Sequence, residues 1–406
     1  MSQRPIGVRI ATAWRVLRKN GVSAFVKKSI GSVTARSLSR PLHDYGFVSS
    51  APLGLPVVSA AVPRHAINWV VPPFAAGAGG HTTIFRFIHH LEQRGFECRI
   101  IVLGGLVWGT ADHFRELIQR SFFPLRAAVY VDSDLPPPAY VTVATGWETA
   151  YWVRRLQSTV HRCYFVQDFE PWFYVVGTRY CLAEATYRFG FRGITAGTWL
   201  AQKLAQDYGM STDAVSFSCD KTVYHPRPRE RSTRKKVFFY ARPSTERRGF
   251  EIGLLTLAEL CRRMPDVTAV FAGGDLSNVE IPFDHVSEGV VDVNRLAELF
   301  NQCDAALVLS LTNLSLLPLE IMACGTPVVS NSGPWVGWLL NEANAFLADP
   351  TVPALADALH RALTDEHAYE RVRAAGLELA NSTSWDAEAD RMAAIFASMG
   401  SGDLRV

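Results

Sequence analysis

Short apolar runs alternate with amphipathic stretches along most of the chain, beginning at residue 67. The run 67–71 ends at Pro72 and Pro73, and a glycine-rich loop follows. Apolar residues with helical spacing then occupy 82–94, and after Gly95 another apolar run covers 97–103. A strand, a glycine-rich loop, a helix and a second strand in this order predict a βαβ unit. Such units imply a parallel sheet with helices on its faces.

The same alternation continues in two series. Strands are predicted at 127–131, 141–144, 163–167, 193–196 and 215–218, with a helix at 198–208. A polar, basic segment at 227–236 precedes the second series, whose strands at 237–240, 267–272, 305–309 and 327–330 alternate with helices at 249–264, 293–301 and 317–323 and lead to a helix-rich end from residue 352. We therefore predict an α/β fold with two doubly wound, Rossmann-like domains, at 65–228 and 229–383, facing across a cleft at the carboxyl ends of their strands.

Composition and charge exclude several classes of protein. Of the 406 residues, 48% are hydrophobic and 19% are charged, as in ordinary globular proteins, and the net charge of +3 argues against a nucleic-acid binder. The long charge-free runs 66–85 and 321–341 contain proline and glycine, so we expect neither to span a membrane. We expect no signal peptide. The seven cysteines form no CxxC pair, which predicts a reduced, cytoplasmic protein without a metal or disulfide framework.

Basic charge is concentrated at the start of the chain. Residues 1–46 hold nine lysines and arginines and one acid, so this segment carries +8 and the remainder −5. Bulky apolar residues lie between the charges, a pattern typical of an amphipathic helix on an anionic membrane surface. We predict that residues 1–64 form a basic helical arm and linker, peripheral on the inner face of the cell membrane. The alternative is a helix that packs on its own domain or on a subunit partner in a homodimer.

The first candidate binding residues lie in the glycine-rich loop. Gly79, Gly80 and His81 follow the first predicted strand and precede a helix. Backbone amides in such a loop can approach an anion with help from the helix dipole. His81 is then a contact to phosphate or sugar; the alternative is a tight turn with an exposed histidine. The loop lacks GxGxxG and the lysine of a P-loop, so a dehydrogenase or a P-loop nucleotidase is a poor fit.

The second series carries sharper candidates. Arg242 and Arg248 follow a strand and precede a helix, where two cations could clamp a diphosphate. Gly273 and Gly274 follow the next strand at the same predicted sheet edge. Glu320 stands within an apolar helical stretch. A carboxylate that is partly buried needs hydrogen-bond donors, and ribose hydroxyls could supply them; the alternative is a solvent-facing helix residue.

The segment LEIMACGTPVVS at 319–330 resembles the signature of glycosyltransferase family 4, whose members are retaining enzymes of the GT-B fold. The resemblance covers about residues 67–390. It implies that Arg242 and the pair Arg248 and Gly249, which match the family's Arg and Lys-Gly, bind the donor diphosphate, and that Asp220 matches an acid of the family. It also implies transfer without a metal or other cofactor, and a C-terminal helix, here 384–400, that crosses back to the first domain.

One family position departs from the pattern. The family often has two glutamates eight positions apart; Glu320 matches the second, which usually binds ribose, whereas the first falls on Thr312. This departure suggests a sugar that is not held through a carboxylate, such as a 6-deoxy sugar. The segments ARPSTERRGFEIGLLTL and VQDFEPWFY resemble most closely the branch that contains bacterial rhamnosyltransferases such as WsaF. Thr312, Ser315 and Leu316 complete the predicted donor contacts.

The candidate catalytic residues follow the strand predicted at 163–167. There Asp168 or Glu170 could position or deprotonate the acceptor, while Arg242 stabilises the departing diphosphate. The alternative for each acid is a salt bridge or a cap. Aromatic residues at 172–174 either stack on sugars or belong to the core. The acids at 132 and 134 have the spacing of a metal-binding DxD motif, but a proline run follows and favours a turn.

The sequence therefore predicts a glycosyltransferase of polysaccharide biosynthesis in the cell envelope. The enzyme would move a hexose or deoxyhexose, rhamnose among them, from a dTDP-, GDP- or UDP-linked donor to a glycan or lipid-linked acceptor. One alternative is an epimerase or a phosphorylase relative of the same fold, although no pyridoxal lysine site is evident. The other is a catalytically inactive GT-B scaffold that binds sugar or nucleotide.

Overall fold

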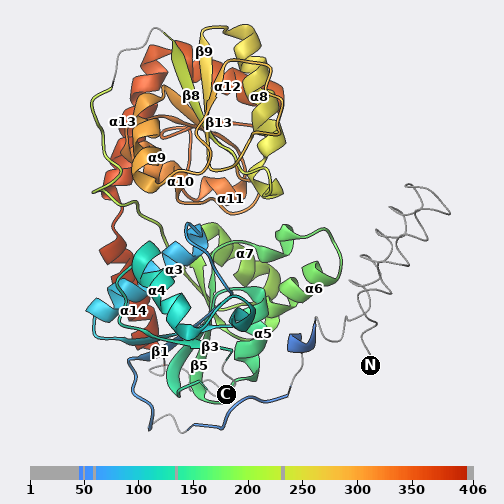
Figure 1. Ribbon diagram of the computed structural model, residues 1–406, viewed down its shortest axis with the longest axis vertical. Helices are drawn as coiled ribbons and strands as arrows, with labels where there is room; N and C mark the ends of the chain where they lie inside the picture. The colour runs from blue at the N-terminus through green and yellow to red at the C-terminus, as the bar shows by residue number, and fades with distance from the viewer. Residues whose placement is uncertain (1–44, 49–50, 58–60, 133–135, 230–233, 400–406) are drawn as a thin grey trace, which may run out of the picture. The chain divides into compact units, whose positions relative to one another are not determined.

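The computed structural model describes residues 45–48, 51–57, 61–132, 136–229 and 234–399 (Figure 1). The chain divides into two units, Met1–Ala51 and Pro52–Val406. Nearly all of the predicted basic arm lies outside the described residues, so the arm stays a prediction. Within the described part, no helix combines the length and the apolar character needed to cross a membrane.

The first sheet contains seven described strands, all parallel, in the order β3-β2-β1-β4-β5-β6-β7. Its strands are β1 (Ala66–Val71), β2 (Glu97–Val102), β3 (Ala128–Val131), β4 (Ala139–Ala144), β5 (Thr159–Val166), β6 (Arg192–Ala196) and β7 (Thr212–Val215). The helices between them are α3 (Gly79–Gln93), α4 (Ala111–Ser121), α5 (Trp147–Arg155), α6 (Thr178–Ala185) and α7 (Thr198–Tyr208). Strand order reverses between β1 and β4, which is the point where doubly wound sheets place ligands.

The second sheet contains six described strands, also parallel, in the order β10-β9-β8-β11-β12-β13. They are β8 (Lys235–Tyr240), β9 (Val267–Ala272), β10 (His285–Ser287), β11 (Ala305–Val308), β12 (Val328–Asn331) and β13 (Phe346–Ala348). The helices are α8 (Phe250–Arg263), α9 (Val293–Gln302), α10 (Leu317–Ala323), α11 (Pro334–Gly337), α12 (Val352–Thr364) and α13 (Glu366–Ser382). Two doubly wound α/β sheets are thus confirmed, and the order of this one reverses between β8 and β11.

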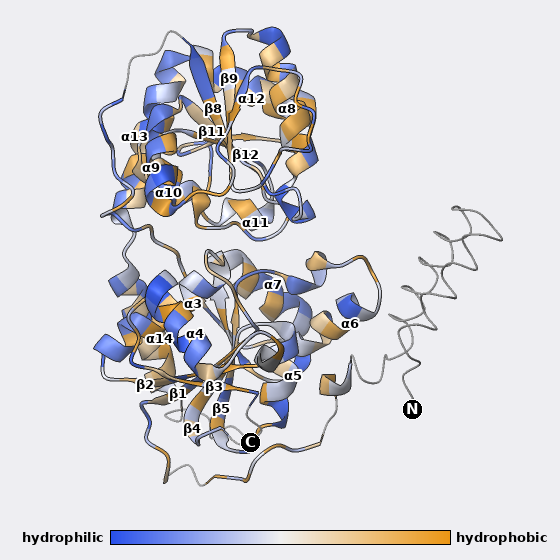
Figure 2. Cartoon of the chain, viewed as in Figure 1, coloured by the Kyte–Doolittle hydropathy of each residue, from blue (hydrophilic) through white to orange (hydrophobic). Residues whose placement is uncertain are grey.

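The strands are apolar because helices cover both faces of each sheet. Every residue of β1, β4 and β9 is buried, and Figure 2 shows hydrophobic residues gathered along strands such as β9 and on the inner faces of the helices. In register, Trp69 pairs with Ile100 of β2 and Val143 of β4. Parallel strands buried on both faces are expected to read as continuous hydrophobic runs, which is the pattern seen in the sequence.

The C-terminal helix α14 (Trp385–Ser398) packs on elements of the first sheet (Figure 1). The Phe396 ring meets Trp69 edge-on at 6.3 Å, and Arg94 Nε of the segment after α3 lies 2.7 Å from an Asp390 carboxylate oxygen. The Ser384 hydroxyl accepts a hydrogen bond from the backbone N–H of Ala387 and caps the helix. The last described helix therefore packs into the core of the first domain.

Several predicted element boundaries are wrong, and two of them have clear local causes. Helix α3 begins at Gly79, three residues before the predicted start, because the chain turns at Gly77 (φ +78°) and leaves Ala78 as N-cap. Strand β7 ends at Val215 and does not continue to 218. Beyond it, the N–H of Ser216 donates to the Glu388 carboxylate of α14 at 2.7 Å and not to a neighbouring strand.

Candidate active site

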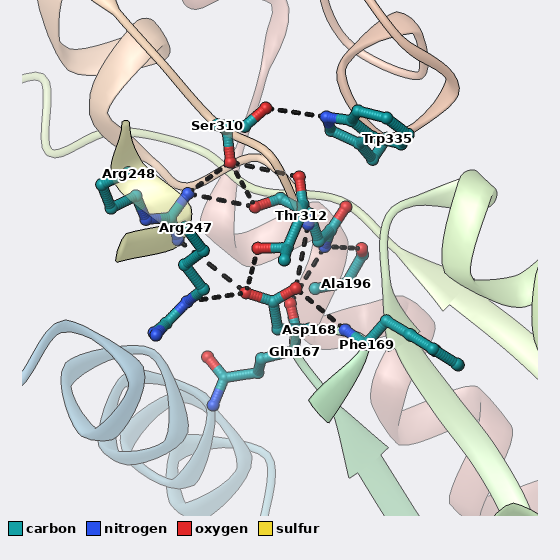
Figure 3. A network of polar contacts seen from close by, with 10 residues as sticks. Gln167, Asp168, Phe169, Ala196, Arg247, Arg248, Ser310, Thr312 and Trp335 are labelled. Atoms are coloured by element: carbon teal, nitrogen blue, oxygen red, sulfur yellow. Dashed lines mark hydrogen bonds and ion pairs between the residues drawn. The ribbon is translucent and has the colours of Figure 1, made fainter. Parts of the chain in front are cut away.

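Asp168 is the centre of a polar network that joins the end of β5 to the loop after β11 (Figure 3). Its Oδ1 accepts hydrogen bonds from the N–H groups of Phe169 and Asn313, at 2.8 and 2.9 Å. Its Oδ2 accepts from the Thr312 hydroxyl at 2.9 Å. Asp168 is buried. Both oxygens are thus engaged, which fits the salt-bridge alternative; a catalytic role stays a prediction.

Asn313 is a second member of this network, and sequence reasoning missed it. Its side-chain amide donates to the carbonyl groups of Gln167 and Ala196, at 2.9 and 2.8 Å, and so reaches the ends of β5 and β6. The residue is fully buried, and its Oδ1 has no hydrogen-bond partner among the described residues. Its signal in the sequence was its position as a polar residue directly before the mostly apolar stretch 314–319. Thr312 donates its hydroxyl to Asp168, and its predicted contact to the donor stays a prediction.

Arg248 is held where the sequence placed a diphosphate clamp. It lies at the end of the short helix Glu246–Arg248, and Gly249 (φ +59°) is the N-cap of α8. The guanidinium donates to the hydroxyl of Ser310 at 2.5 Å and to the carbonyl of Asn313 at 3.2 Å, and it lies 3.9 Å from Asp168 Oδ2. A cation beside a helix N-terminus is suited to bind phosphate.

Two more arginines lie close to Arg248. Arg247, which was not predicted, places Nε 3.5 Å from Asp168 Oδ2 and its guanidinium 4.1 Å from the centre of the Phe173 ring. Arg242 donates to the Tyr240 hydroxyl at 3.0 Å. Burial lowers the pKa of Arg248, Asp168 opposes that effect, and the charges of Arg247 and Arg242 lower it further. Three cations therefore share one region, and Asp168 forms ion pairs with two of them, Arg247 and Arg248.

Gly273 and Gly274 follow β9 and are required by packing. Gly273 has φ +103°, and a Cβ there would come 2.5 Å from the Tyr240 ring; at Gly274 a Cβ would come 2.9 Å from the carbonyl oxygen of Ala241. The loop therefore lies directly against the residues that lead to Arg242. A donor contact through this pair stays a prediction.

Glu320 lies on α10 and is half-buried. Burial raises its pKa to about 7, while the Arg86 guanidinium and the Tyr224 hydroxyl favour the ionised form. Arg86, on α3, packs between the rings of Phe123 and Trp385 at 5.0 and 4.9 Å. Arg86 was missed, although a lone cation within the apolar run 84–88 gave the same signal as Glu320. Ribose binding by Glu320 stays a prediction.

His81 lies in the first turn of α3 with Gly79 and Gly80, not in a loop. Its Nε2 donates to the Pro72 carbonyl at 3.2 Å, and burial lowers its pKa to about 4. The imidazole is therefore neutral near pH 7 and supplies no positive charge to a phosphate. The alternative of a water-exposed histidine is wrong, because the half-buried ring lies 5.0 Å from that of Phe74. A contact of His81 to sugar or phosphate stays a prediction. Gly80 accepts a hydrogen bond from Gln167 Nε2 at 3.1 Å through its carbonyl.

Three other predicted positions have simpler surroundings. Ser315 is half-buried, and Leu316 is the N-cap of α10. Of the candidate DxD acids, Asp132 has φ 45° and accepts a hydrogen bond from the N–H of Gly104, whereas position 134 lies outside the described residues. In the part of the chain that the structure describes, no three His, Cys, Asp or Glu residues are placed to hold a metal ion.

Glu170 is buried inside the first domain. Its carboxylate accepts hydrogen bonds from the Trp147 N–H, in the first turn of α5, at 2.7 Å and from the Tyr164 hydroxyl at 2.8 Å. Burial raises its pKa to about 8 in spite of these donors. The contacts fit the cap that was the alternative to catalysis, because an acid at a helix N-terminus stabilises the helix.

Glu170→Gln is expected to flatten the dependence of stability on pH. Because the folded pKa of about 8 lies above the ordinary value of 4.5, the carboxyl contributes stability that is complete below pH 4.5 and is lost as the pH rises through 8. The loss is on the order of 4 kcal/mol. Urea unfolding between pH 5 and 8 measures it. The same slope in wild type and variant would contradict the shifted pKa.

Comparison with known proteins agrees with this architecture. Residues 235–360 match the family model of the WsaF C-terminal domain, and residues 138–196 match that of the WsaF N-terminal domain. The O-antigen biosynthesis protein RfbC of Myxococcus xanthus is 32% identical over 363 residues, which are 84% of this chain and 28% of that protein. The chain thus contains segments similar to both domains of WsaF. It spans little more than a quarter of the length of its relative from Myxococcus.

Solved structures show that this WsaF-like chain has the GT-B fold. Sucrose-phosphate synthase from Thermosynechococcus elongatus is 14% identical with a TM-score of 0.63 and covers 82% of this chain and 98% of its own. HepE from Anabaena, in complex with UDP and glucose, is 14% identical with a TM-score of 0.63 and covers 82% of this chain and 100% of its own. The pneumococcal O-GlcNAc transferase GtfA, in complex with UDP and GlcNAc, is 9% identical with a TM-score of 0.62 and covers 82% of this chain and 98% of its own. At these identities the likeness establishes the fold.

Proposed function

We propose that this chain is a WsaF-like glycosyltransferase, which moves a sugar from a nucleoside-diphosphate donor to a glycan or lipid-linked acceptor. The observation that carries the proposal is the group of three arginines at the carboxyl edge of the second sheet, two of them on a single carboxylate. The UDP complexes of HepE and GtfA, which share the fold, and the O-antigen biosynthesis name of RfbC support the same substrate class.

The arginines define the chemical step. As the bond between the anomeric carbon and the diphosphate oxygen breaks, negative charge develops on the leaving phosphate, and Arg248 and Arg242 would stabilise it together with the N-terminus of α8. The acceptor hydroxyl would attack the anomeric carbon and pass its proton to the departing phosphate. We therefore propose a retaining transfer in which no metal takes part.

The donor sugar is proposed to be a deoxyhexose such as rhamnose. The support is the residue at 312, where the related enzymes often have a glutamate. Here the Thr312 hydroxyl donates to Asp168, so the position presents no carboxylate to a sugar. The nucleotide of the donor is proposed to be dTDP, GDP or UDP, and a donor panel distinguishes the three.

A panel of dTDP-, GDP- and UDP-sugars tests the activity. The purified chain should hydrolyse or transfer one member of the panel, with nucleoside diphosphate released as the product that is measured. Tight binding of a nucleotide sugar with no release on any acceptor would instead support the inactive scaffold. Binding of none of them would contradict both.

Residues 1–46 are proposed to attach the enzyme to an anionic membrane surface. The support is the charge of +8 in a segment rich in bulky apolar residues. The intact chain should sediment with vesicles of anionic phospholipid at low salt, and a variant lacking residues 1–46 should stay in the supernatant. An intact chain that ignores such vesicles would show that the arm serves another partner.

A further inference from the structure

Three tryptophans from separate elements lie together next to the arginine network. Trp172 belongs to the short helix Glu170–Phe173, Trp199 to α7 and Trp335 to α11. The ring centres are 5.8 Å apart for Trp172 and Trp199, 5.7 Å for Trp172 and Trp335, and 6.2 Å for Trp199 and Trp335. Trp172 is 36% exposed, which is unusual for so large an apolar side chain in contact with two others. We call these three residues the tryptophan platform.

The platform is attached directly to the predicted leaving-group site. Trp335 Nε1 donates to the carbonyl of Ser310 at 2.7 Å, and the hydroxyl of the same serine accepts the bond from Arg248. Figure 3 shows Trp335 and Arg248 both reaching Ser310. One residue therefore separates the aromatic surface from the cation that would bind the diphosphate. A ligand on the platform would therefore lie near the arginine that is proposed to bind the diphosphate.

Lys203 lies against the exposed Trp172 ring and is paired with Asp207. Lys203 Nζ lies 5.4 Å from the Trp172 ring centre and 2.7 Å from an Asp207 carboxylate oxygen. A sugar ring presents apolar C–H groups on its face and hydroxyl groups around its edge. An aromatic face beside a lysine and an aspartate can satisfy both at once, since the ring covers the C–H groups and the ion pair offers donors and acceptors.

We propose that the tryptophan platform is the acceptor subsite, where a sugar ring of the acceptor glycan stacks on Trp172 with its hydroxyls toward Lys203 and Asp207. This proposal rests on the proposed function. An acceptor is favoured over the donor because the exposed Trp172 ring and Lys203 come from the first domain, whereas Trp335, Arg242 and Arg248 come from the second. The subsite would hold the nucleophilic hydroxyl next to the arginines.

The test measures glycoside binding in the absence of donor. Methyl glycosides of rhamnose, glucose, mannose and N-acetylglucosamine serve as probes, followed by ligand-observed NMR. Wild type should bind at least one probe, and Trp172→Ala should weaken that binding about tenfold. Trp172→Phe should retain most of it, because a ring remains. Trp108→Ala, at a 71% exposed tryptophan outside the platform, is the matched control and should bind as wild type does.

Donor affinity is measured on the same variants. Trp172→Ala should bind nucleoside diphosphates with unchanged affinity. A wild type that binds no glycoside, equal binding by wild type and Trp172→Ala, or a parallel loss of diphosphate affinity would overturn the subsite. Failure of the transferase proposal looks different, because no nucleotide sugar would then be bound or cleaved whatever the glycoside data show.

Discussion

Arg248→Ala is expected to weaken nucleoside-diphosphate binding about 100-fold, with a comparable fall in turnover. The side chain is fixed by Ser310, Asn313 and Asp168 before any donor arrives, so little ordering entropy remains to be lost on binding. Charge-assisted hydrogen bonds contribute about 1.5–3 kcal/mol each, and two decades of affinity correspond to about 2.7 kcal/mol. Isothermal titration with UDP, GDP and dTDP measures the change directly.

Two further arginine variants separate charge from geometry. Arg248→Lys keeps the positive charge but loses the forked donor, so its affinity should lie between those of wild type and Arg248→Ala. Arg242→Ala should also bind diphosphate much more weakly. Arg262→Ala, on the outer face of α8, removes a cation that pairs with Glu259 and should leave binding unchanged. Unchanged affinity in both Arg242→Ala and Arg248→Ala would show that the diphosphate binds elsewhere.

Helices and strands could be predicted from the sequence where the hydrophobic pattern of the element continues over enough residues to be recognised. Strand β9 and helix α10 have the predicted bounds, because a fully buried strand and an apolar helix followed by Gly325 each leave a clear local signal. Strand β10 and helix α11 were not predicted. The first has only three residues, all exposed, and the second has only four residues, so neither is long enough to show a hydrophobic period.

The candidate site was predicted as a set of residue types but not as a set of contacts. Arg242, Arg248 and Glu320 could be predicted as site residues because the sequence shows a charged residue after a strand or within an apolar helix. Asp168 could be predicted as a site residue too. Its hydrogen-bond partner Asn313 is 145 residues away in the sequence, so no local pattern indicates that the two residues meet. The protonation of Glu170 and His81 depends on how deeply tertiary packing buries them, which sequence does not specify.

Asp168→Asn should decide whether Asp168 is a catalytic base or an anion that is paired with the arginines. Asparagine keeps an oxygen for the N–H groups of Phe169 and Asn313, but it removes the negative charge that lies 3.5 and 3.9 Å from Arg247 and Arg248. Breaking such a pair leaves two cations facing each other, and we expect the free energy of unfolding to fall by about 2–4 kcal/mol. We also expect diphosphate to bind several-fold more tightly, because the carboxylate no longer competes with phosphate for the arginines.

A catalytic base would give a different result. Loss of a group that takes the acceptor proton lowers kcat by about 100-fold or more and removes its limb of the pH–rate profile, while diphosphate affinity and stability stay near wild type. Thr312→Val is the matched control, since it deletes one hydrogen bond to Asp168 and leaves both arginine contacts in place. If Thr312→Val is nearly silent and Asp168→Asn shifts affinity and stability together, Asp168 acts as the anion that holds the two arginines in position until the diphosphate replaces it.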